Sequence, residues 1–258
     1  MTAVEVHAVV EGPDDAPVLL LSNSLGADHT MWNPQVPALT ERFRVVRYDT
    51  RGHGRSPAAA GDATIDDLAD DVVALLDRLG VAQAHVAGLS IGGMTGLRLA
   101  VREPQRVASL AVLCSSAHTG NPQSWRERAE TARAQGTGVL AGTVVSRWLT
   151  PGYAAQHPDL VARLEAMVHA ADDEGYAGCC AAIAAMDQRS DLSRITAPTL
   201  VVSGADDPAL PPEHQQVLAD GIPGAQLLSL SPAAHLANLE QPEQVTDALI
   251  AHATGGTA

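Results

Sequence analysis

The segment HVAGLSIGGMTGLRLA, residues 85–100, constrains the fold of this chain more than any other. A short apolar run leads into Gly88-Leu89-Ser90, and an apolar-periodic stretch follows at once, as at a turn between a strand and a helix. Small residues two places before and after such a serine avoid collisions, and the turn, a nucleophile elbow, exposes the hydroxyl at the helix N-terminus. The alternative is a glycine-rich turn that merely joins two elements, so the rest of the chain must supply a base, an acid and an oxyanion site.

Strands alternate with helices along most of the chain, which predicts a mostly parallel sheet covered on both faces. We expect strands at residues 4–10, 18–21, 44–48, 82–87, 107–114, 199–203 and 226–230. Helices are expected at 65–79 and 91–102 and from about residues 213 and 243. The length of 258 residues and the apolar content of 46% suit one large α/β unit.

Residues 118–187 interrupt this alternation. They are rich in Ala, Arg, Glu and Met and carry no clear strand. A stretch of this length is too long for an ordinary crossover between neighbouring strands. We therefore predict a helical cap, residues 118–187, inserted into a core made of residues 1–117 and 188–258.

The net charge of −14 repels phosphate backbones and argues against nucleic-acid binding. It also means that an anionic substrate needs a local cation. We find neither a secretory leader nor an apolar run of about 20 residues, so no membrane association is expected. Three cysteines, Cys114, Cys179 and Cys180, occur without a C-x-x-C pattern and indicate a reducing cytoplasm rather than disulfides or structural zinc.

A catalytic base is predicted at His235, which follows the expected strand 226–230 through the short loop SPAAH. The acid should follow the preceding strand, where VVSGADDPALP offers Asp206 and Asp207, and we expect only one of them to face the histidine. With Ser90 the chain order is serine, aspartate, histidine, which is the order of α/β-hydrolases. Ser90 would attack a carbonyl, His235 would take and return its proton, and the aspartate would orient the imidazole.

A tetrahedral intermediate needs two N–H donors for its oxyanion. The backbone of Ile91, directly after the nucleophile, is the first expected donor. The second should come from the loop SNSLGADHTMW, which follows the expected strand 18–21.

The chain resembles the α/β-hydrolase superfamily over almost its full length. The resemblance rests on LLLSNSLGADHTMW, YDTRGHGRSP, HVAGLSIGGMTGLRLA, APTLVVSGADDPALP and AAHLANLEQPE. It implies an α/β-hydrolase fold: a mostly parallel eight-stranded sheet flanked by helices, with an inserted helical cap. It further implies Asp207 as the acid, three residues after Gly204, and Leu25 as the second oxyanion donor, although Asn23-Ser24 stands where the superfamily usually has His-Gly.

Three segments, SNSLGADHTMW, RWLTPGY and YAGCCAAI, resemble 3-oxoadipate enol-lactonases of aromatic-acid catabolism. The resemblance implies a cytoplasmic carboxylic ester hydrolase that opens 3-oxoadipate enol-lactone to 3-oxoadipate through a Ser-His-Asp triad and an acyl-enzyme. It implies no metal and no organic cofactor. The partner would be a small anionic lactone, and the sequence leaves the oligomeric state open.

The carboxylate of such a substrate needs a cation in a chain this acidic. Arg147 in SRWLTPGY is the candidate, with Trp148 beside it as an apolar wall, because caps of this superfamily face the nucleophile. A planar guanidinium can hold a carboxylate bidentately. A solvated cap residue is the alternative interpretation of Arg147, and Arg51 in DTRGHGRS is the rival cation.

Other activities share this triad. A carboxylesterase, or a perhydrolase of the cofactor-free haloperoxidase type, would use the same three residues, and only the oxyanion loop and the cap favour a lactonase. A non-catalytic hydrolase-fold receptor for a small ligand is a remote alternative. Epoxide hydrolases and haloalkane dehalogenases are disfavoured, because they need an aspartate where this chain has Ser90.

Overall fold

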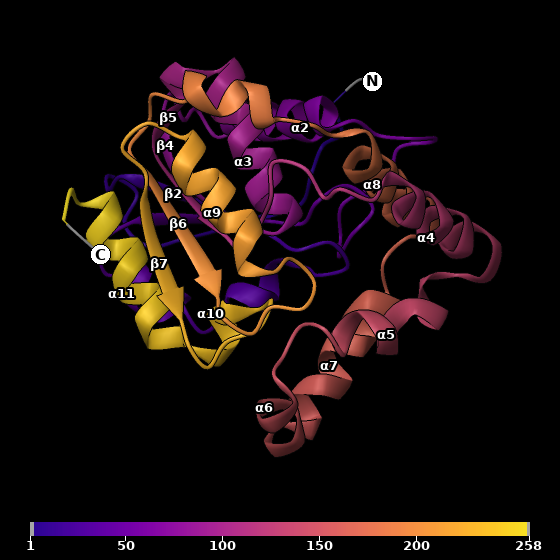
Figure 1. Ribbon diagram of the computed structural model, residues 1–258. Helices are drawn as coiled ribbons and strands as arrows, with labels where there is room; N and C mark the ends of the chain where they lie inside the picture. Colours follow the sequence, from indigo (N-terminus) through magenta and orange to yellow (C-terminus); the bar gives the residue numbers. More distant parts are fainter. Residues whose placement is uncertain (1–2, 257–258) are drawn as a thin grey trace.

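A mixed seven-stranded sheet organises the molecule in the computed structural model, which describes residues 3–256 (Figure 1). Its order is β1-β3-β2-β4-β5-β6-β7, with β1 antiparallel to β3 and the other neighbouring pairs parallel. The ends of the predicted core, residues 1–2 and 257–258, lie outside the described part of the chain. The strands are β1 (Ala8–Glu11), β2 (Val18–Ser22), β3 (Arg44–Tyr48), β4 (Ala84–Leu89), β5 (Val107–Leu113), β6 (Thr199–Gly204) and β7 (Gln226–Leu230).

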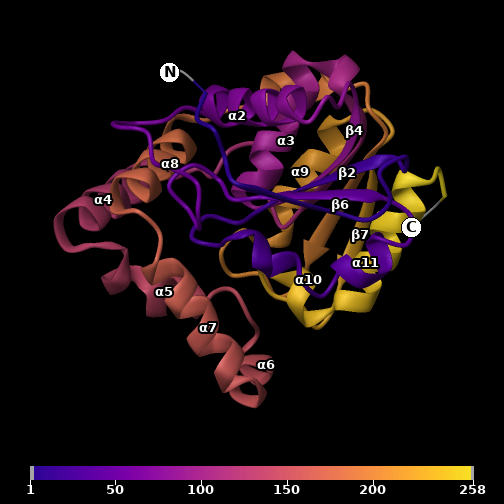
Figure 2. The ribbon, with the colours of Figure 1, turned by 180° about the vertical axis from the view of Figure 1, so that it is seen from behind.

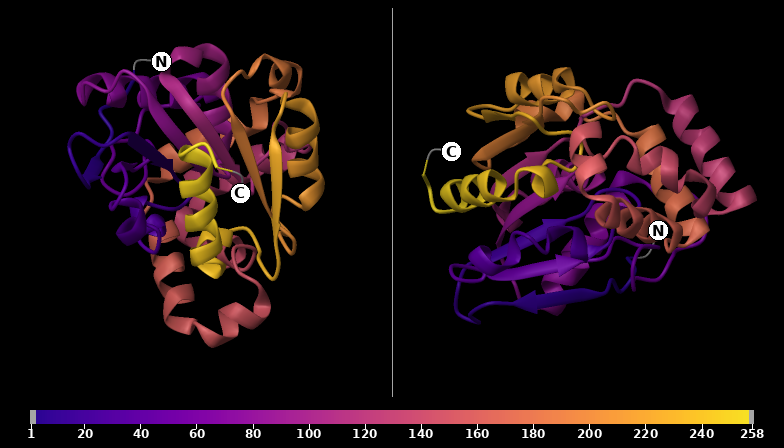
Figure 3. Two further views of the ribbon diagram at one scale, coloured as in Figure 1. Left: turned by 90° about the vertical axis from the view of Figure 1, so that its left-hand side faces the viewer. Right: turned by 90° about the horizontal axis from the view of Figure 1, so that it is seen from below.

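Helices cover both faces of this sheet (Figures 1 and 3). One face carries α2 (Ile65–Arg78), α3 (Ile91–Arg102) and α9 (Pro212–Gly221). The other carries α1 (Val36–Leu39) and α11 (Pro242–Ala253). The remaining elements are α4 (Pro122–Gln135), α5 (Ala141–Val145), α6 (Pro151–Gln156), α7 (Pro158–His169), α8 (Asp173–Ala185), α10 (Ala237–Glu240) and the 3₁₀ turns η1 (His29–Trp32), η2 (Pro104–Arg106), η3 (Thr137–Leu140) and η4 (Arg189–Arg194).

The alternation of side chains along the strands divides the core into two layers. In β2, Leu19 and Leu21 pack with the layer that contains α1 and α11, while Leu20 packs with the layer that contains α2, α3 and α9. All three leucines are buried. A continuous apolar strand is the pattern of a parallel sheet covered on both faces, as the sequence predicted.

The described residues form seven strands, which corrects the eight-stranded sheet that the resemblance implied and agrees with the seven ranges expected from the sequence. The strand expected at residues 4–10 is shorter and begins at Ala8. Before it, the backbone N–H of Val4 donates to Asp71 Oδ1 at 2.7 Å, and that of His7 donates to Ser56 Oγ at 2.8 Å. Side chains distant in the sequence therefore take the bonds that a neighbouring strand would have made.

Several predicted elements are confirmed with their bounds. Helix α3 and strand β7 occupy the expected ranges 91–102 and 226–230. Helix α2 begins after Thr64, whose hydroxyl accepts a hydrogen bond from the Asp67 N–H while the Asp67 side chain accepts one from the Thr64 N–H. This capping box explains why the helix begins there.

Between α4 and α8 the described chain forms only helices and turns, and these group at one side of the sheet (Figures 1 and 2). The division into a cap at 118–187 and a core around it stays a prediction. Helix α8 meets the core at a close approach of two glycines, since a Cβ on Gly52 would lie 2.4 Å from the Gly175 Cα. Two backbone bonds flank it, from Asp172 N–H to Gly52 O at 2.9 Å and from Ala63 N–H to Gly178 O at 3.2 Å.

None of the helices in residues 3–256 combines the length and the apolar character that crossing a bilayer would require.

Candidate active site

The carboxyl ends of four parallel strands carry the predicted catalytic positions. Leu25 follows β2, Ser90 follows β4, Asp207 follows β6 and His235 follows β7. Parallel strands end at the same edge of a sheet, which is where open α/β sheets bind their ligands. Leu25, Ser90 and His235 line one pocket at this edge.

Ser90 lies on the tight turn between β4 and α3 with φ 58° and ψ −120°. Among the described non-glycine residues, only Ser90 and Cys114 have positive φ. The conformation is held by hydrogen bonds from Ser90 N–H to Leu113 O at 2.9 Å and from Ser115 Oγ to Ser90 O at 2.7 Å. A non-glycine residue held in this region stores strain, and such strain gathers at functional sites.

The glycines around Ser90 are required by close backbone contacts. A Cβ on Gly88 would lie 2.2 Å from the Gly92 carbonyl oxygen, and one on Gly92 would lie 2.5 Å from the Ser22 carbonyl oxygen. On Gly93 it would lie 2.7 Å from the Ser115 side chain. The G-x-S-x-G spacing is therefore explained by backbone packing at the turn.

His235 and Asp207 form a buried pair. His235 Nδ1 lies 2.8 Å from Asp207 Oδ2, and the two side chains are 4% and 0% exposed. The other carboxylate oxygen accepts hydrogen bonds from the N–H groups of Ala209 at 2.8 Å and Leu210 at 3.0 Å. These contacts orient the carboxylate toward the imidazole.

The neighbouring Asp206 points elsewhere. It is exposed, and its Oδ2 accepts a hydrogen bond from the Ala233 N–H at 3.2 Å. Its own N–H donates to Ala233 O at 2.9 Å. The structure thus brings Asp207, and not Asp206, onto His235.

No hydrogen bond joins Ser90 to His235 in the described part of the chain, although both line the same pocket. Bonds between a nucleophile and its base are often long when no substrate is bound and shorten in the reacting complex.

The expected oxyanion donors are available. Around them, Gly26 N–H donates to His53 Nε2 at 2.9 Å, and Gly92 N–H donates to Asn23 O at 3.0 Å, which ties the loop after β2 to the start of α3. Within residues 3–256, the N–H groups of Leu25 and Ile91 have no acceptor. Two unpaired donors beside a serine are what an oxyanion site needs.

Residues between positions 118 and 187 form another part of the pocket wall. Arg147 and Trp148 both line it, with Trp148 buried and Arg147 exposed. An outer chamber of about 430 Å³ adjoins the pocket and shares Arg147 with it. This volume lies within the range of small-molecule sites.

Sequence reasoning missed Arg128 of helix α4, which lines both the pocket and the outer chamber. Its guanidinium lies 5.1 Å from the Trp125 ring centroid. The spacing of three residues in WRERA places both side chains on one helix face, which is the signal that could have found it.

The rival cation Arg51 lies away from the pocket and is buried. Its Nε lies 2.6 Å from Asp71 Oδ2, and a terminal nitrogen lies 2.7 Å from Asp71 Oδ1. The same nitrogen donates to Asp67 O at 3.1 Å. Arg51 therefore joins the turn after β3 to helix α2.

One seam of hydrogen bonds ties residues 148–150 to the loop of residues 234–240, which carries His235. The Glu240 carboxylate accepts hydrogen bonds from Thr150 N–H at 3.0 Å, Thr150 Oγ1 at 2.5 Å and Ala234 N–H at 2.6 Å. Leu236 N–H donates to Trp148 O at 2.8 Å. The segment that carries Trp148 into the pocket wall is thus fixed to the loop that carries His235.

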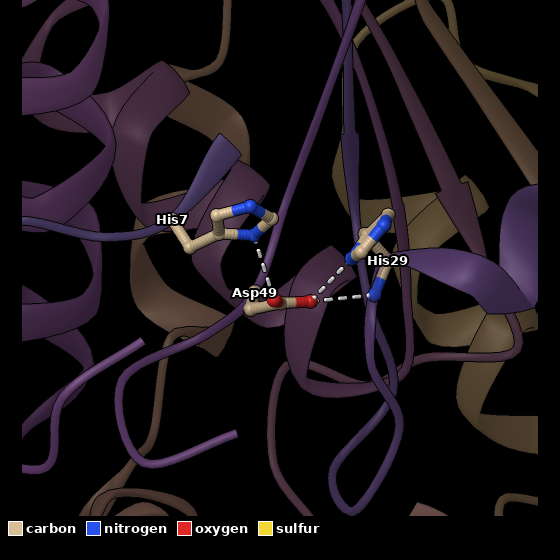
Figure 4. A group of neighbouring side chains, drawn as sticks. All are labelled: His7, His29 and Asp49. Atoms are coloured by element: carbon tan, nitrogen blue, oxygen red, sulfur yellow. Dashed lines mark hydrogen bonds and ion pairs between the residues drawn. The ribbon is translucent and has the colours of Figure 1, made fainter. Parts of the chain in front are cut away.

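A second polar cluster supports the oxyanion loop (Figure 4). Asp49 Oδ2 lies 3.0 Å from His7 Nδ1 and accepts the Arg55 N–H at 3.0 Å, while Oδ1 lies 2.8 Å from both the backbone nitrogen and Nδ1 of His29. Burial alone would raise the pKa of Asp49, but the hydrogen bonds from His29 and Arg55 lower it to about 2. Two histidines and a carboxylate could also suit a transition metal. Four N–H groups already satisfy this carboxylate, so the cluster acts as a hydrogen-bond node.

The chain matches known proteins over most of its length. The family described as alpha/beta hydrolase fold matches residues 17–145. The 3-oxoadipate enol-lactonase 2 of Acinetobacter baylyi is 40% identical over 246 residues, which cover 95% of this chain and 92% of that protein. A RutD protein of Stutzerimonas stutzeri, provisionally named a carbamate hydrolase, is 33% identical and covers 96% of this chain and 95% of its own.

The crystal structure of the enol-lactonase from Burkholderia xenovorans LB400 superimposes with a TM-score of 0.95 at 42% identity and covers 97% of each chain. The chain therefore belongs to the α/β-hydrolase fold family, is a hydrolase, and is similar in sequence and structure to enol-lactonases.

Proposed function

We propose that this enzyme hydrolyses 3-oxoadipate enol-lactone to 3-oxoadipate in aromatic-acid catabolism, with Ser90, His235 and Asp207 as its catalytic triad. The observation that carries the proposal is one pocket lined by the elbow serine, by a histidine paired with a buried aspartate, and by two arginines. The similarity to enol-lactonases at 40% and 42% identity supports the choice of substrate. The three buried free cysteines support a cytoplasmic location.

In the proposed mechanism, Ser90 Oγ bonds to the lactone carbonyl carbon while His235 Nε2 takes the hydroxyl proton. The N–H groups of Leu25 and Ile91 stabilise the oxyanion. When the intermediate collapses, the ring C–O bond breaks, and the leaving enolate takes the proton back from His235 and becomes a ketone. Water activated by His235 then attacks the acyl-enzyme, which frees Ser90 and a new carboxylate. Asp207 orients the imidazole and stabilises its protonated form.

Arg147 and Trp148 are proposed to contact the substrate through the carboxylate and the ring, respectively. Both residues line the pocket that contains Ser90. Trp148 is fixed through its carbonyl to the histidine loop, so an apolar wall is held close to the nucleophile. The guanidinium of Arg147 has no acidic partner in residues 3–256 and is free to bind an anion.

Carbamate hydrolysis at the same triad is a second candidate, because a RutD protein is 33% identical over nearly the whole chain. A serine hydrolase acting on ordinary esters would also use these residues.

The test is loss of the enol-lactone absorbance with purified protein, in parallel with Ser90→Ala. Activity on the lactone that exceeds activity on a neutral aryl ester and on an aryl carbamate, and that disappears in the variant, would support the proposal. Turnover of the carbamate or ester with no turnover of the lactone would refute it.

A further inference from the structure

We infer that Arg128 is the principal cation of an anion subsite that selects ester and lactone substrates with a free carboxylate at the far end of the acyl chain. This inference deepens the proposed function and, for the enol-lactone itself, rests on it. It gives Arg147, the more exposed of the two arginines that line the pocket, a secondary role.

The surroundings of Arg128 hold its guanidinium in place. The guanidinium lies 5.1 Å from the ring centroid of Trp125 and 5.9 Å from that of Tyr176. Cations near aromatic faces are attracted to them, and the attraction strengthens where water is excluded. Arg128 is half-buried, whereas Arg147 is exposed. A cation held by two rings loses less side-chain freedom on binding a ligand than one extended into solvent.

Arg128 has no acidic partner in the described residues. Arg133 of the same helix does have acidic partners, since it pairs with Glu174 at 3.0 Å and with Asp62 at 2.8 Å. Although the chain has 30 acidic and 16 basic residues, both arginines in the wall of the nucleophile pocket, Arg128 and Arg147, lack an acidic partner in residues 3–256. Buried or half-buried guanidinium groups normally have hydrogen-bond acceptors, and a substrate carboxylate would supply them.

The Tyr176 ring beside Arg128 belongs to the interior of the protein. Tyr176 is fully buried, and its ring centroid lies 5.9 Å from the Arg128 guanidinium. It lines neither the pocket nor the outer chamber. Tyr176 therefore supports Arg128 from behind, and the side of the guanidinium that faces the pocket stays available to a ligand.

The acidic residue that lines the outer chamber does not neutralise the subsite. Glu127 is exposed, and its Oε1 accepts a hydrogen bond from Gln123 at 3.1 Å. The inner pocket, which contains Ser90 and His235, has Arg128 and Arg147 in its wall and no carboxylate. The arginines in the wall of the inner pocket are therefore not neutralised by a carboxylate in the same wall, although the whole chain is negative.

The test compares two activated esters of equal length, the anionic mono-4-nitrophenyl glutarate and the neutral 4-nitrophenyl pentanoate. The readout is the ratio of their kcat/KM values in wild type, Arg128→Met, Arg128→Lys, Arg147→Met and Arg126→Met. Arg126 is an exposed residue of the same helix that does not line the pocket, so its variant is the matched control. Circular dichroism checks that each variant folds.

We expect Arg128→Met to lower the ratio about 10- to 100-fold, mainly through the KM of the anionic ester, as for the loss of a charge-assisted hydrogen bond. Arg128→Lys should recover part of it because the charge remains, and Arg147→Met should lower it less. A ratio that is unchanged in Arg128→Met, or that falls further in Arg147→Met, would overturn the inference.

The two proposals fail separately. An Arg128-dependent preference for the glutarate ester without turnover of the enol-lactone would refute the proposed substrate and keep the subsite. Rapid turnover of the enol-lactone, together with a ratio of kcat/KM values that does not change in Arg128→Met, would keep the proposed function and refute the subsite.

Discussion

Asp49→Asn tests the node formed by His7, His29 and Asp49. The carboxylate accepts four hydrogen bonds, two of them from backbone N–H groups, whereas an asparagine offers one oxygen and a donor NH₂. A histidine can change tautomer and accept a hydrogen bond from the NH₂, but the backbone N–H of Arg55 or of His29 can only donate. One backbone donor is therefore left unsatisfied, which should lower the free energy of unfolding by about 1–3 kcal/mol.

The charge of Asp49 makes a contribution to the free energy of unfolding that depends on pH. The pKa falls from 3.8 to about 2, and at roughly 1.4 kcal/mol per unit the ionised form contributes about 2 kcal/mol. Because the pKa is lower in the folded state, this contribution is fully present above about pH 4 and is lost as the pH falls toward 2. The variant lacks the ionised group, so its deficit should be about 2 kcal/mol larger at neutral pH than near pH 2.

Urea unfolding followed by circular dichroism, at several pH values between about 7 and 2.5, measures this difference. Asp14→Asn is the matched control, because Asp14 is an exposed carboxylate. A deficit of Asp49→Asn that stays constant over this range would refute the reasoning, since it would mean that the folded state does not favour the ionised carboxylate.

Three further changes test the site. Ser90→Ala should lower turnover by about 10⁶-fold in a folded protein, and a tenth of wild-type activity remaining in the ester assay would contradict the nucleophile assignment. Asp207→Asn should cost about 10⁴-fold in kcat, while Asp206→Asn should cost little because Asp206 does not contact His235; the reverse order would shift the acid by one residue. Glu240→Gln should lower the free energy of unfolding by about 1.5–3 kcal/mol and impair both KM and kcat, because this carboxylate bonds to the cap and to the histidine loop; steady-state kinetics with an unchanged kcat would show that the loop does not depend on it.

The parts of the fold that could be predicted from sequence are those whose causes are local. Gly88 is required within the elbow itself, because a Cβ there would lie 2.2 Å from the Gly92 carbonyl oxygen. Helix α2 begins where its capping box lies in the sequence. The residues alone left Asp206 and Asp207 open, and the resemblance to α/β-hydrolases implied Asp207, which the structure places 2.8 Å from His235.

The parts that could not be predicted depend on residues far apart in the chain. The segment before β1 does not extend the strand, because Asp71 and Ser56 take its N–H groups. Arg128 faces the pocket because α4 packs on α8 and brings Tyr176 to it, and no local pattern specifies that packing. The partners of Asp49 come from positions 7, 29 and 55 and gather only in the folded sheet.

The two seams between residues 118–187 and the rest of the chain limit how this segment could be exchanged between relatives. At one seam a methyl group on either Gly52 or Gly175 would collide with the opposite backbone, so donor and recipient must both keep glycine there. At the other, Thr150 belongs to the transplanted piece and Glu240 to the recipient. A chimaera that altered substrate preference by grafting residues 118–187 would therefore have to carry matched residues from the 234–240 loop, and the exchangeable module is larger than the helical insert alone.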